Sequence, residues 1–229
     1  MPKSDWYTSS IGKKALMALS GLILLGFVIM HLLGNLLIFL GPNALNAYAV
    51  KLRHFGPWLW VARSLLLAAV VIHSITSIQL ARENRAARPV RYRVYRPAVT
   101  GYAARTMMLS GVLVLAYIIY HLLHFTFRVT NPEISHGVDA LGRRDVYSMV
   151  VLSFQQPLIF AIYVLGVGLL CLHLSHGIGS TCQSLGINRE RTIARANQLG
   201  QAIALLLFLG YVSIPLAVLM GRVTIPRVF

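Results

Sequence analysis

The feature that most constrains this chain is the length of its apolar stretches. Five of them run for about 20 residues or more with almost no charged side chain, enough for an α-helix to cross about 30 Å of hydrocarbon. Composition agrees, because 57% of the 229 residues are hydrophobic and only 12% are charged, whereas a soluble domain has about 25% charged residues. We therefore predict an all-α fold, a transmembrane helical bundle formed by a single domain, residues 1–229. The five predicted spanning helices cover residues 15–40, 61–80, 106–127, 157–180 and 199–220.

The composition also excludes several classes of protein. The chain has 21 Lys and Arg against 6 Asp and Glu, a formal charge of +15, yet it has few charged residues in all. A soluble enzyme or a nucleic-acid-binding domain would spread its charges over a polar surface, and a disordered chain would lack the apolar excess. The basic residues must therefore lie in the segments that connect the spans. The two cysteines form no CxxC motif, which argues against a zinc ribbon, thioredoxin chemistry and covalently attached c-type haem.

The basic residues are distributed unequally on the two sides of the predicted spans. With the N-terminus inside, the inner segments contain 13 of the 21 basic residues. The positive-inside rule then favours a cytoplasmic N-terminus and a C-terminus outside. The densest run, residues 82–97, either only holds its segment in the cytoplasm or also docks a cytoplasmic partner or anionic lipid, and the two interpretations are compatible.

The N-terminal region bears on localisation. Its apolar stretch continues to Leu40, which is too long for a signal peptide, and the Arg- and Ser-rich pattern of a transit peptide is missing. We therefore expect the first stretch to be a retained span and the chain to be a multi-pass protein of the bacterial cytoplasmic membrane.

Histidine placement is the most informative feature inside the spans. Six of the eight histidines lie there, although an ionisable group at membrane depth is costly and usually faces the bundle interior, where it pairs or binds a ligand. A single such histidine could do no more than hydrogen-bond a neighbouring helix. One in each of four successive spans indicates a shared role. The six are His31, His73, His121, His124, His173 and His176.

Four of these histidines fall at two depths. At 1.5 Å rise per residue, His31 and His121 lie about 24 and 23 Å from the inner ends of their spans, and His73 and His173 lie about 10 Å from theirs. Each level offers two imidazoles on different helices, and a planar haem between facing helices takes one axial histidine from each side. We therefore expect two b-type haems, an outer one on His31 and His121 and an inner one on His73 and His173. Haems so spaced would form an electron-transfer path across the membrane.

Two spans contain an H-x-x-H pair that offers an alternative ligand. His124 lies about 4 Å too far out and His176 about 4 Å too far in to match the level of the opposing histidine. A metal site made from one H-x-x-H pair would lack a supporting carboxylate. We expect His124 and His176 to contact a haem propionate, a quinone or a polar neighbour. The loop histidines, His54 and His136, are expected at the surface, and His54 is also a quinone candidate.

Residues near the span ends are candidates for the remaining contacts. Basic side chains there either neutralise haem propionates or only anchor the topology, and the candidates are Lys14 and Arg105 inside and Arg63 outside. Glycines in the spans allow close helix packing, beside a cofactor or simply between helices. The outer segment 128–156 is expected to be a solvated surface, with room for a short interfacial helix. Candidates for contact with a quinone are Ser10, Lys14 and Ser20 on the inner side and Asn35, Arg53, His54 and Trp58 on the outer side.

Four stretches carry a likeness to a known family. They are SSIGKKALMALSGL with IMHLLGNL, VVIHSITS, RTMMLSG with IYHLLHFT, and LHLSHGIGSTCQSLG. They resemble the cytochrome b membrane-anchor subunit of type B succinate:menaquinone oxidoreductases and quinol:fumarate reductases, in its form with two haems and five helices. The likeness covers nearly the whole chain, and a histidine in each of the first four helices is fairly specific. By resemblance the axial ligands are His31, His73, His121 and His173, and the spacing to Gly186 selects His173 over His176.

The resemblance implies an activity shared with two other subunits. A flavoprotein with FAD and the succinate site, and an iron–sulfur subunit, would sit on the cytoplasmic side. Electrons would pass from the flavin through the clusters and the two haems to menaquinone. This chain would hold no dicarboxylate site, and the basic run 82–97 would dock the iron–sulfur subunit. The implied partners are those two subunits, quinone and membrane lipid, with no nucleic acid, while the reaction direction and any higher oligomer stay open.

One departure from the family and several alternatives stay open. Some fumarate-reducing relatives place a carboxylate near the outer quinone pocket, but residues 41–60 contain no Asp or Glu, so the quinone site and any proton coupling are undecided. The membrane cytochrome of respiratory nitrate reductase draws haem ligands from its last helix, whereas span 199–220 has no histidine. A transporter usually shows inverted repeats and discontinuous helices, and no internal repeat stands out. A haem-free membrane anchor is the remaining alternative.

Overall fold

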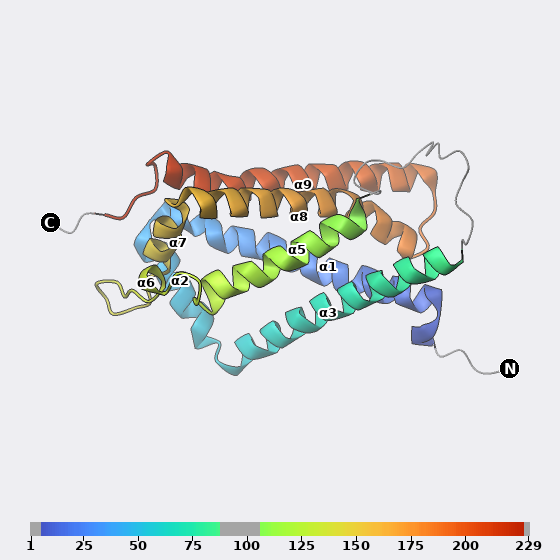
Figure 1. The fold of residues 1–229 in the computed structure, drawn as a ribbon, viewed down its shortest axis with the longest axis horizontal. Helices are drawn as coiled ribbons and strands as arrows, with labels where there is room; N and C mark the ends of the chain where they lie inside the picture. Colours follow the sequence, from blue (N-terminus) through green and yellow to red (C-terminus); the bar gives the residue numbers. More distant parts are fainter. Residues whose placement is uncertain (1–5, 88–105, 227–229) are drawn as a thin grey trace. The chain divides into compact units, whose positions relative to one another are not determined.

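The computed structural model describes residues 6–87 and 106–226, which are almost entirely helical (Figure 1). Helix makes up 83% of the structure, and no strand occurs among these residues. Five helices, two of them extended by a short segment, are long and apolar enough to cross a membrane. The prediction of an all-α fold with five candidate spans is confirmed, and it indicates a multi-pass membrane protein. The long helices are α1 (Ser10–Asn35), α3 (Pro57–Ala86), α5 (Met107–His121), α8 (Pro157–Ser184) and α9 (Glu190–Leu219).

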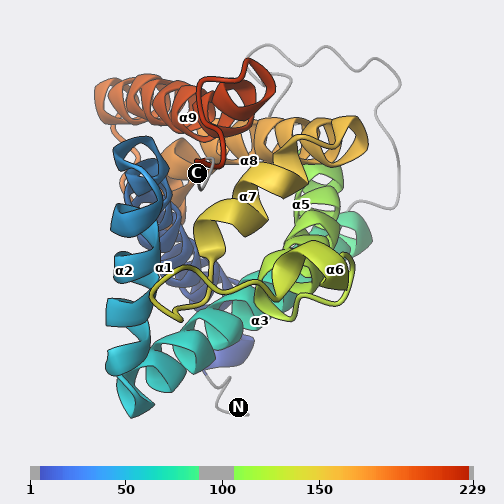
Figure 2. The ribbon, with the colours of Figure 1, turned by 90° about the vertical axis from the view of Figure 1, so that its left-hand side faces the viewer.

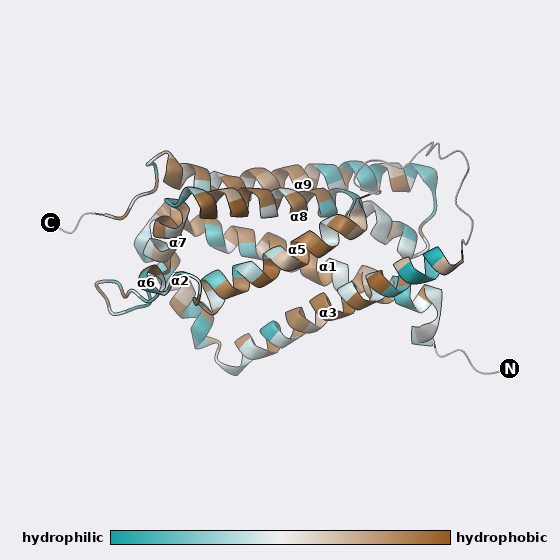
Figure 3. Ribbon diagram, viewed as in Figure 1, coloured by the Kyte–Doolittle hydropathy of each residue, from teal (hydrophilic) through white to brown (hydrophobic). Residues whose placement is uncertain are grey.

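Four of the long helices, α1, α3, α8 and α9, extend beyond the apolar stretches from which they were predicted. α3 covers Pro57–Ala86 where the apolar pattern predicted 61–80. α8 begins at Pro157, in line with the preference of proline for a first helical turn, and α9 contains Pro215 and runs unbroken to Leu219. Polar residues, teal in Figure 3, gather at the C-terminal end of α3 and in the first turns of α9. The apolar pattern marks only the part of a helix that is apolar enough to lie in hydrocarbon, so these polar turns were not predicted.

α5 continues into a π-helical turn. This turn, η3 (Leu122–Thr126), follows His121 directly, and such turns are frequent at functional sites. Arg128 then adopts a φ of 60°, a left-handed conformation that is uncommon for a residue with a side chain. Its Nη1 donates a hydrogen bond to the carbonyl oxygen of Ser135 at 2.9 Å. α1 likewise changes character after Asn35, where the 3-10 segment η2 (Leu36–Leu40) begins.

Within the described residues, three shorter helices connect long ones. They are α2 (Pro42–His54), α6 (Pro132–Ser135) and α7 (Val146–Phe154). Figure 2 shows α7 beside both α2 and α6, and both pairs are in contact. α2 was not predicted, because its sequence is too polar and too short to resemble a span. α6 and α7 lie in the outer segment 128–156, where only one short helix was anticipated.

The chain divides into two compact units, and each long helix contributes residues to both. The first unit comprises Met1–Phe27, Arg63–Gly111 and Leu172–Ala204, and the second comprises Val28–Ala62, Val112–Cys171 and Leu205–Phe229. The second unit contains an apolar core to which η2, α2, α7, α8 and α9 contribute. Many large apolar side chains of the long helices are exposed, as expected for helices that face lipid. The core includes Ile38, Leu45, Val151, Phe154, Ile159, Ile214 and Val218.

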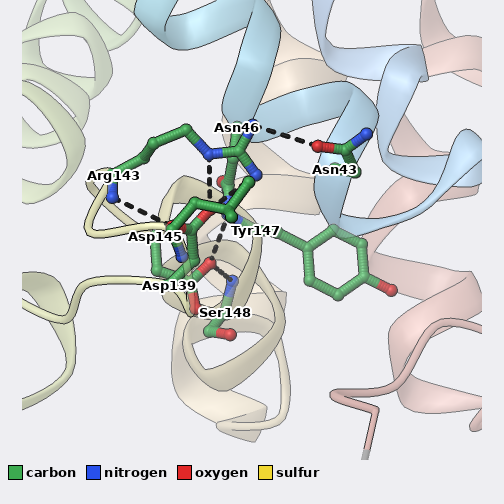
Figure 4. A network of polar contacts seen from close by, with 8 residues as sticks. Asn43, Asn46, Asp139, Arg143, Asp145, Tyr147 and Ser148 are labelled. Atoms are coloured by element: carbon green, nitrogen blue, oxygen red, sulfur yellow. Dashed lines mark hydrogen bonds and ion pairs between the residues drawn. The ribbon is translucent and has the colours of Figure 1, made fainter.

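A polar cluster in the second unit joins α2 to the segment before α7 (Figure 4). Asn46 on α2 is completely buried, and its Nδ2 donates to Asp139 Oδ2 at 3.2 Å and to Asp145 Oδ1 at 3.0 Å. Its Oδ1 accepts a hydrogen bond from the backbone N–H of Tyr147 at 3.0 Å. The expectation that these acidic side chains form only a solvated surface was therefore wrong. Their partner lies 93 and 99 residues away in the sequence, so no local pattern could reveal it.

Acid should weaken this cluster. Arg143 hydrogen-bonds Asp139 through Nε and Nη2 at 2.7 Å each, and this lowers the pKa of the Asp139 carboxyl to about 2. That value lies below the ordinary value of about 3.9, so the ionised carboxylate stabilises the fold fully above about pH 4, and the stabilisation is lost as the pH falls through about 2. We expect the thermal unfolding temperature of the detergent-purified chain to fall over this window, and to fall less in an Asp139→Asn variant.

A matched control separates this effect from general acid unfolding. Glu133 is exposed on α6, and a Glu133→Gln variant should keep the wild-type dependence on pH. Parallel pH profiles for wild type and Asp139→Asn, measured by differential scanning fluorimetry, would contradict the role given to Asp139.

Candidate functional site: two pairs of facing histidines

Four histidines form two facing pairs, one within each unit. His31 on α1 and His121 at the end of α5 belong to the second unit, and their ring centroids lie 5.8 Å apart with an interplanar angle of 87°. His73 on α3 and His173 on α8 belong to the first unit, with centroids 6.2 Å apart and an angle of 74°. The structure thus brings together the two pairs that were matched by depth in the sequence. Their role as iron ligands stays a prediction.

The spacing within each pair suits one metal ion between two imidazoles. Nitrogen–metal bonds of about 2 Å on opposite sides of an ion place the ring centres roughly 6 Å apart. The observed separations are 5.8 and 6.2 Å. Among the described residues, no group of three or more His, Cys, Asp or Glu side chains could hold a metal ion by itself. A porphyrin would supply an ion between two imidazoles with four further nitrogen ligands.

A backbone carbonyl orients the first ring of the pair in the first unit. His73 Nδ1 lies 3.0 Å from the carbonyl oxygen of Met17 on α1, and Ser20 Oγ lies 3.5 Å from the same nitrogen. Because a carbonyl oxygen can only accept, His73 must carry its proton on Nδ1. Its Nε2 lone pair is then available to a ligand.

The second ring of this pair is oriented in the same way by α5. His173 Nδ1 lies 3.2 Å from Ser110 Oγ, and Ser110 donates its own proton to the carbonyl oxygen of Met107 at 3.1 Å. The serine oxygen must therefore accept a hydrogen bond from the N–H of His173. Both rings of the pair thus offer an Nε2 lone pair, the usual state of a metal-ligating histidine whose other nitrogen donates to an oxygen.

Glycine leaves room beside both of these rings. A Cβ atom added to Gly21 would lie 3.2 Å from His73 Cε1, and one added to Gly111 would lie 3.3 Å from His173 Cε1. A longer side chain at either position would occupy the space next to the imidazole. Other glycines of the predicted spans have different neighbours. An added Cβ would meet Tyr48 at Gly34, Tyr117 at Gly166 and Phe208 at Gly168, and it would have no atom within 4 Å at Gly26 or Gly177.

These contacts reveal an internal repeat that was not predicted. Residues 17–21 read Met-Ala-Leu-Ser-Gly and His31 follows ten residues after the glycine. Residues 107–111 read Met-Met-Leu-Ser-Gly and His121 follows after the same interval. The expectation that no repeat is present was therefore wrong. The exchange of Leu, Ile and Val at several positions hides the pattern, which the shared Met, Leu, Ser, Gly and His positions reveal.

The repeat divides the chain into a first half, α1 to α3, and a second half, α5 to α8. It extends to the second long helix of each half. Pro57 begins α3 sixteen residues before His73, and Pro157 begins α8 sixteen residues before His173. In each half, the Ser-Gly pair of the first helix contacts the histidine ring of the second helix. The first helix of each half also provides a histidine of the other pair. The two histidine pairs are therefore built from equivalent parts of the two halves.

Aromatic side chains surround the pair in the second unit. The ring centroid of Tyr211 on α9 lies 6.4 Å from that of His31, and its hydroxyl donates to the carbonyl oxygen of Val28 at 2.7 Å. An apolar, aromatic-rich wall with a few placed polar groups is typical of a cofactor site. The rings around His121 are Tyr117, Phe125 and Tyr163, with centroid separations of 6.3, 5.7 and 5.9 Å.

The H-x-x-H pair at the end of α5 is divided between two roles. His121 faces His31, whereas His124 is completely buried and uses both ring nitrogens in hydrogen bonds. His124 Nδ1 lies 2.9 Å from Tyr163 Oη, and its Nε2 lies 3.2 Å from Ser153 Oγ on α7. Of the three contacts expected for His124, the structure therefore shows the polar neighbours.

The other predicted site residues differ in exposure. His176 is partly buried on α8, Lys14 and Ser10 are exposed near the start of α1, and Arg63 is exposed on α3. Lys13, rather than Lys14, forms an ion pair with Glu83 of α3. Arg105 and residues 88–97 of the basic run lie outside the described residues. Among the outer quinone candidates, Asn35 is partly buried and Arg53, His54 and Trp58 are exposed, and all these roles stay predictions.

Comparison of the chain with protein-family models, with curated proteins and with solved structures finds no match.

Proposed function

We propose that this chain is a membrane cytochrome b that holds two b haems and passes electrons between them. The observation that carries the proposal is the pair of facing imidazoles in each unit, with ring centroids 5.8 and 6.2 Å apart. The hydrogen bonds that hold the protons of His73 and His173 on Nδ1 give further support, because they leave Nε2 lone pairs for iron. Four histidines on four candidate spans form two sites of the same kind.

The finer assignment is the membrane-anchor subunit of a succinate dehydrogenase in a bacterial cytoplasmic membrane. In this assignment the N-terminus is cytoplasmic and the C-terminus is outside. Electrons arrive from an iron–sulfur subunit, which receives them from a flavoprotein with FAD, and leave to menaquinone. The support is the likeness of the histidine-bearing stretches to that family together with the excess of basic residues in the inner segments. The pair His73/His173 is then the inner site and His31/His121 the outer one.

The residues of this chain have defined tasks in the proposed function. A bound haem would supply one-electron exchange at its iron, and each histidine pair would hold one haem. Gly21 and Gly111 keep the space beside the inner rings open. α1 contributes to both sites, because Gly21 lies beside His73 and His31 belongs to the other pair. These two residues are ten positions, or about 15 Å, apart along the helix.

Haem content tests the proposal directly. The full-length chain, expressed with added haem precursor and purified in detergent, should contain two b haems per chain in a pyridine haemochrome assay. A variant with alanine at His31, His73, His121 and His173 is the control and should contain none. Fewer than two haems per chain at saturating haem would refute the two-haem proposal.

The finer assignment needs a separate measurement. In membranes from the source cells, succinate should reduce haem bound to this chain, and malonate, a competitive inhibitor of succinate oxidation, should prevent this. Reduction by formate but not by succinate would instead favour the cytochrome of a different respiratory oxidoreductase.

A further inference from the structure

The buried polar groups around His124 form a continuous chain of hydrogen bonds in the second unit. The chain begins at the carbonyl oxygen of Met149 on α7, which lies 2.7 Å from Ser153 Oγ. It continues from Ser153 Oγ to His124 Nε2 at 3.2 Å and from His124 Nδ1 to Tyr163 Oη at 2.9 Å. It ends at His121 Nδ1, 3.4 Å from the same tyrosine oxygen. The chain therefore links α7, η3 and α8 to a histidine of the outer pair.

The Met149 carbonyl fixes the direction of every link. A carbonyl oxygen can only accept, so the single hydroxyl proton of Ser153 is donated to it. The Ser153 oxygen must then accept from the Nε2–H of His124. His124 lies among aromatic rings, completely buried, where a neutral imidazole is favoured. A neutral imidazole with its proton on Nε2 has a lone pair on Nδ1.

The remaining two links follow from that lone pair. Tyr163 must donate its hydroxyl proton to His124 Nδ1 at 2.9 Å. The Tyr163 oxygen can then only accept from His121, so His121 carries its proton on Nδ1 and a lone pair on Nε2. This is the same tautomer that Met17 and Ser110 impose on His73 and His173.

We propose that His124, Tyr163 and Ser153 are positioning residues that hold His121 in the tautomer and orientation needed to bind the iron of the outer haem. The inference rests on the proposed function and adds a specific task for three residues that do not touch the iron. It also explains why His121 rather than His124 is the ligand, because both nitrogens of His124 are engaged. A hydrogen bond accepted from the Nδ1–H makes the imidazole a stronger donor to iron and favours the oxidised state.

The experiment uses the full-length chain with both haems bound. Tyr163→Phe removes the oxygen that accepts from His121, and His124→Leu removes the group that orients it. His124→Asn keeps an acceptor close to the position of Nδ1 and should restore the wild-type behaviour. The matched control is Tyr117→Phe, because the Tyr117 ring lies 6.3 Å from that of His121 but, among the described residues, makes no hydrogen bond to it. The readouts are the electron paramagnetic resonance spectrum and the midpoint potential of each haem.

The proposal expects a change at one haem alone. Tyr163→Phe and His124→Leu should raise the midpoint potential and shift the g values of the haem on His31/His121, with the other haem unchanged and two haems still bound. Loss of only that haem, with the second signal intact, would also support the proposal. Unchanged spectra and potentials in both variants, or equal shifts in Tyr117→Phe, would overturn it. If wild type itself bound no haem, the proposed function would fail first, so the two failures are distinguishable.

Discussion

Alanine at His31 or at His121 should remove one haem and leave the other in place, and alanine at His73 or at His173 should do the converse. The two members of each pair have ring centroids 5.8 or 6.2 Å apart within the same unit. Under the proposed function, loss of one imidazole would leave that pair with a single ligand for its haem, while the other pair would keep both. Haem content should fall from two to one per chain, and one of two low-spin signals in the electron paramagnetic resonance spectrum should disappear.

The pattern across the four variants is more informative than any single one. His31→Ala and His121→Ala should delete the same signal, and the other two variants should delete the second. His136 is exposed in the outer segment and His136→Ala should retain both haems. Loss of the same signal from His31→Ala and His73→Ala would show that the pairing is wrong. Far-ultraviolet circular dichroism of the same samples separates haem loss from unfolding.

Under the proposed function, leucine at Gly21 or at Gly111 should prevent haem binding at His73/His173 while His31/His121 keeps its haem. Even a Cβ at these positions would come within 3.2 Å of His73 or 3.3 Å of His173, and the rest of a leucine side chain would fill the space beside the ring. Overpacking of this kind forces side chains or backbone to shift. The expected result is one haem per chain, identified by its signal as the one on His31/His121.

The control for this prediction lies on the same helix. Gly26 is exposed on α1 and has no atom within 4 Å of an added Cβ, so Gly26→Leu should keep both haems. Loss of haem in Gly26→Leu equal to that in Gly21→Leu would show that glycine is needed for α1 itself rather than for space beside His73. Retention of two haems in Gly21→Leu and Gly111→Leu would remove the steric argument.

The spans were predictable because hydrocarbon imposes a length and a polarity on each helix. About 20 apolar residues are needed to cross it, and no pattern of tertiary contacts alters that requirement. The pairing of the histidines was predictable for a related reason. The rise of an α-helix converts sequence position into depth, so His31 could be matched to His121 and His73 to His173 before any contact was known.

The supporting residues could not be predicted in this way. Asn46 contacts Asp139 and Asp145 across 93 and 99 residues, and the polar sequence of α2 gives no sign that its asparagine is buried. His124 and His121 are three residues apart in the same motif, and depth alone separated them by only about 4 Å. The neighbours of each ring distinguish their roles. His124 hydrogen-bonds Tyr163 and Ser153, whereas His121 faces His31.

The repeat has a consequence for how the protein is made. Each facing pair joins a histidine of the first half, α1 to α3, with one of the second half, α5 to α8. The first half leaves the ribosome with one imidazole for each site and completes neither. Under the proposed function, the His31/His121 site would be complete only after α5 has been inserted and the His73/His173 site only after α8, so haem loading would follow insertion of the second half. A chain cut between the halves would not yield two one-haem cytochromes, but two fragments that must meet before either can bind haem.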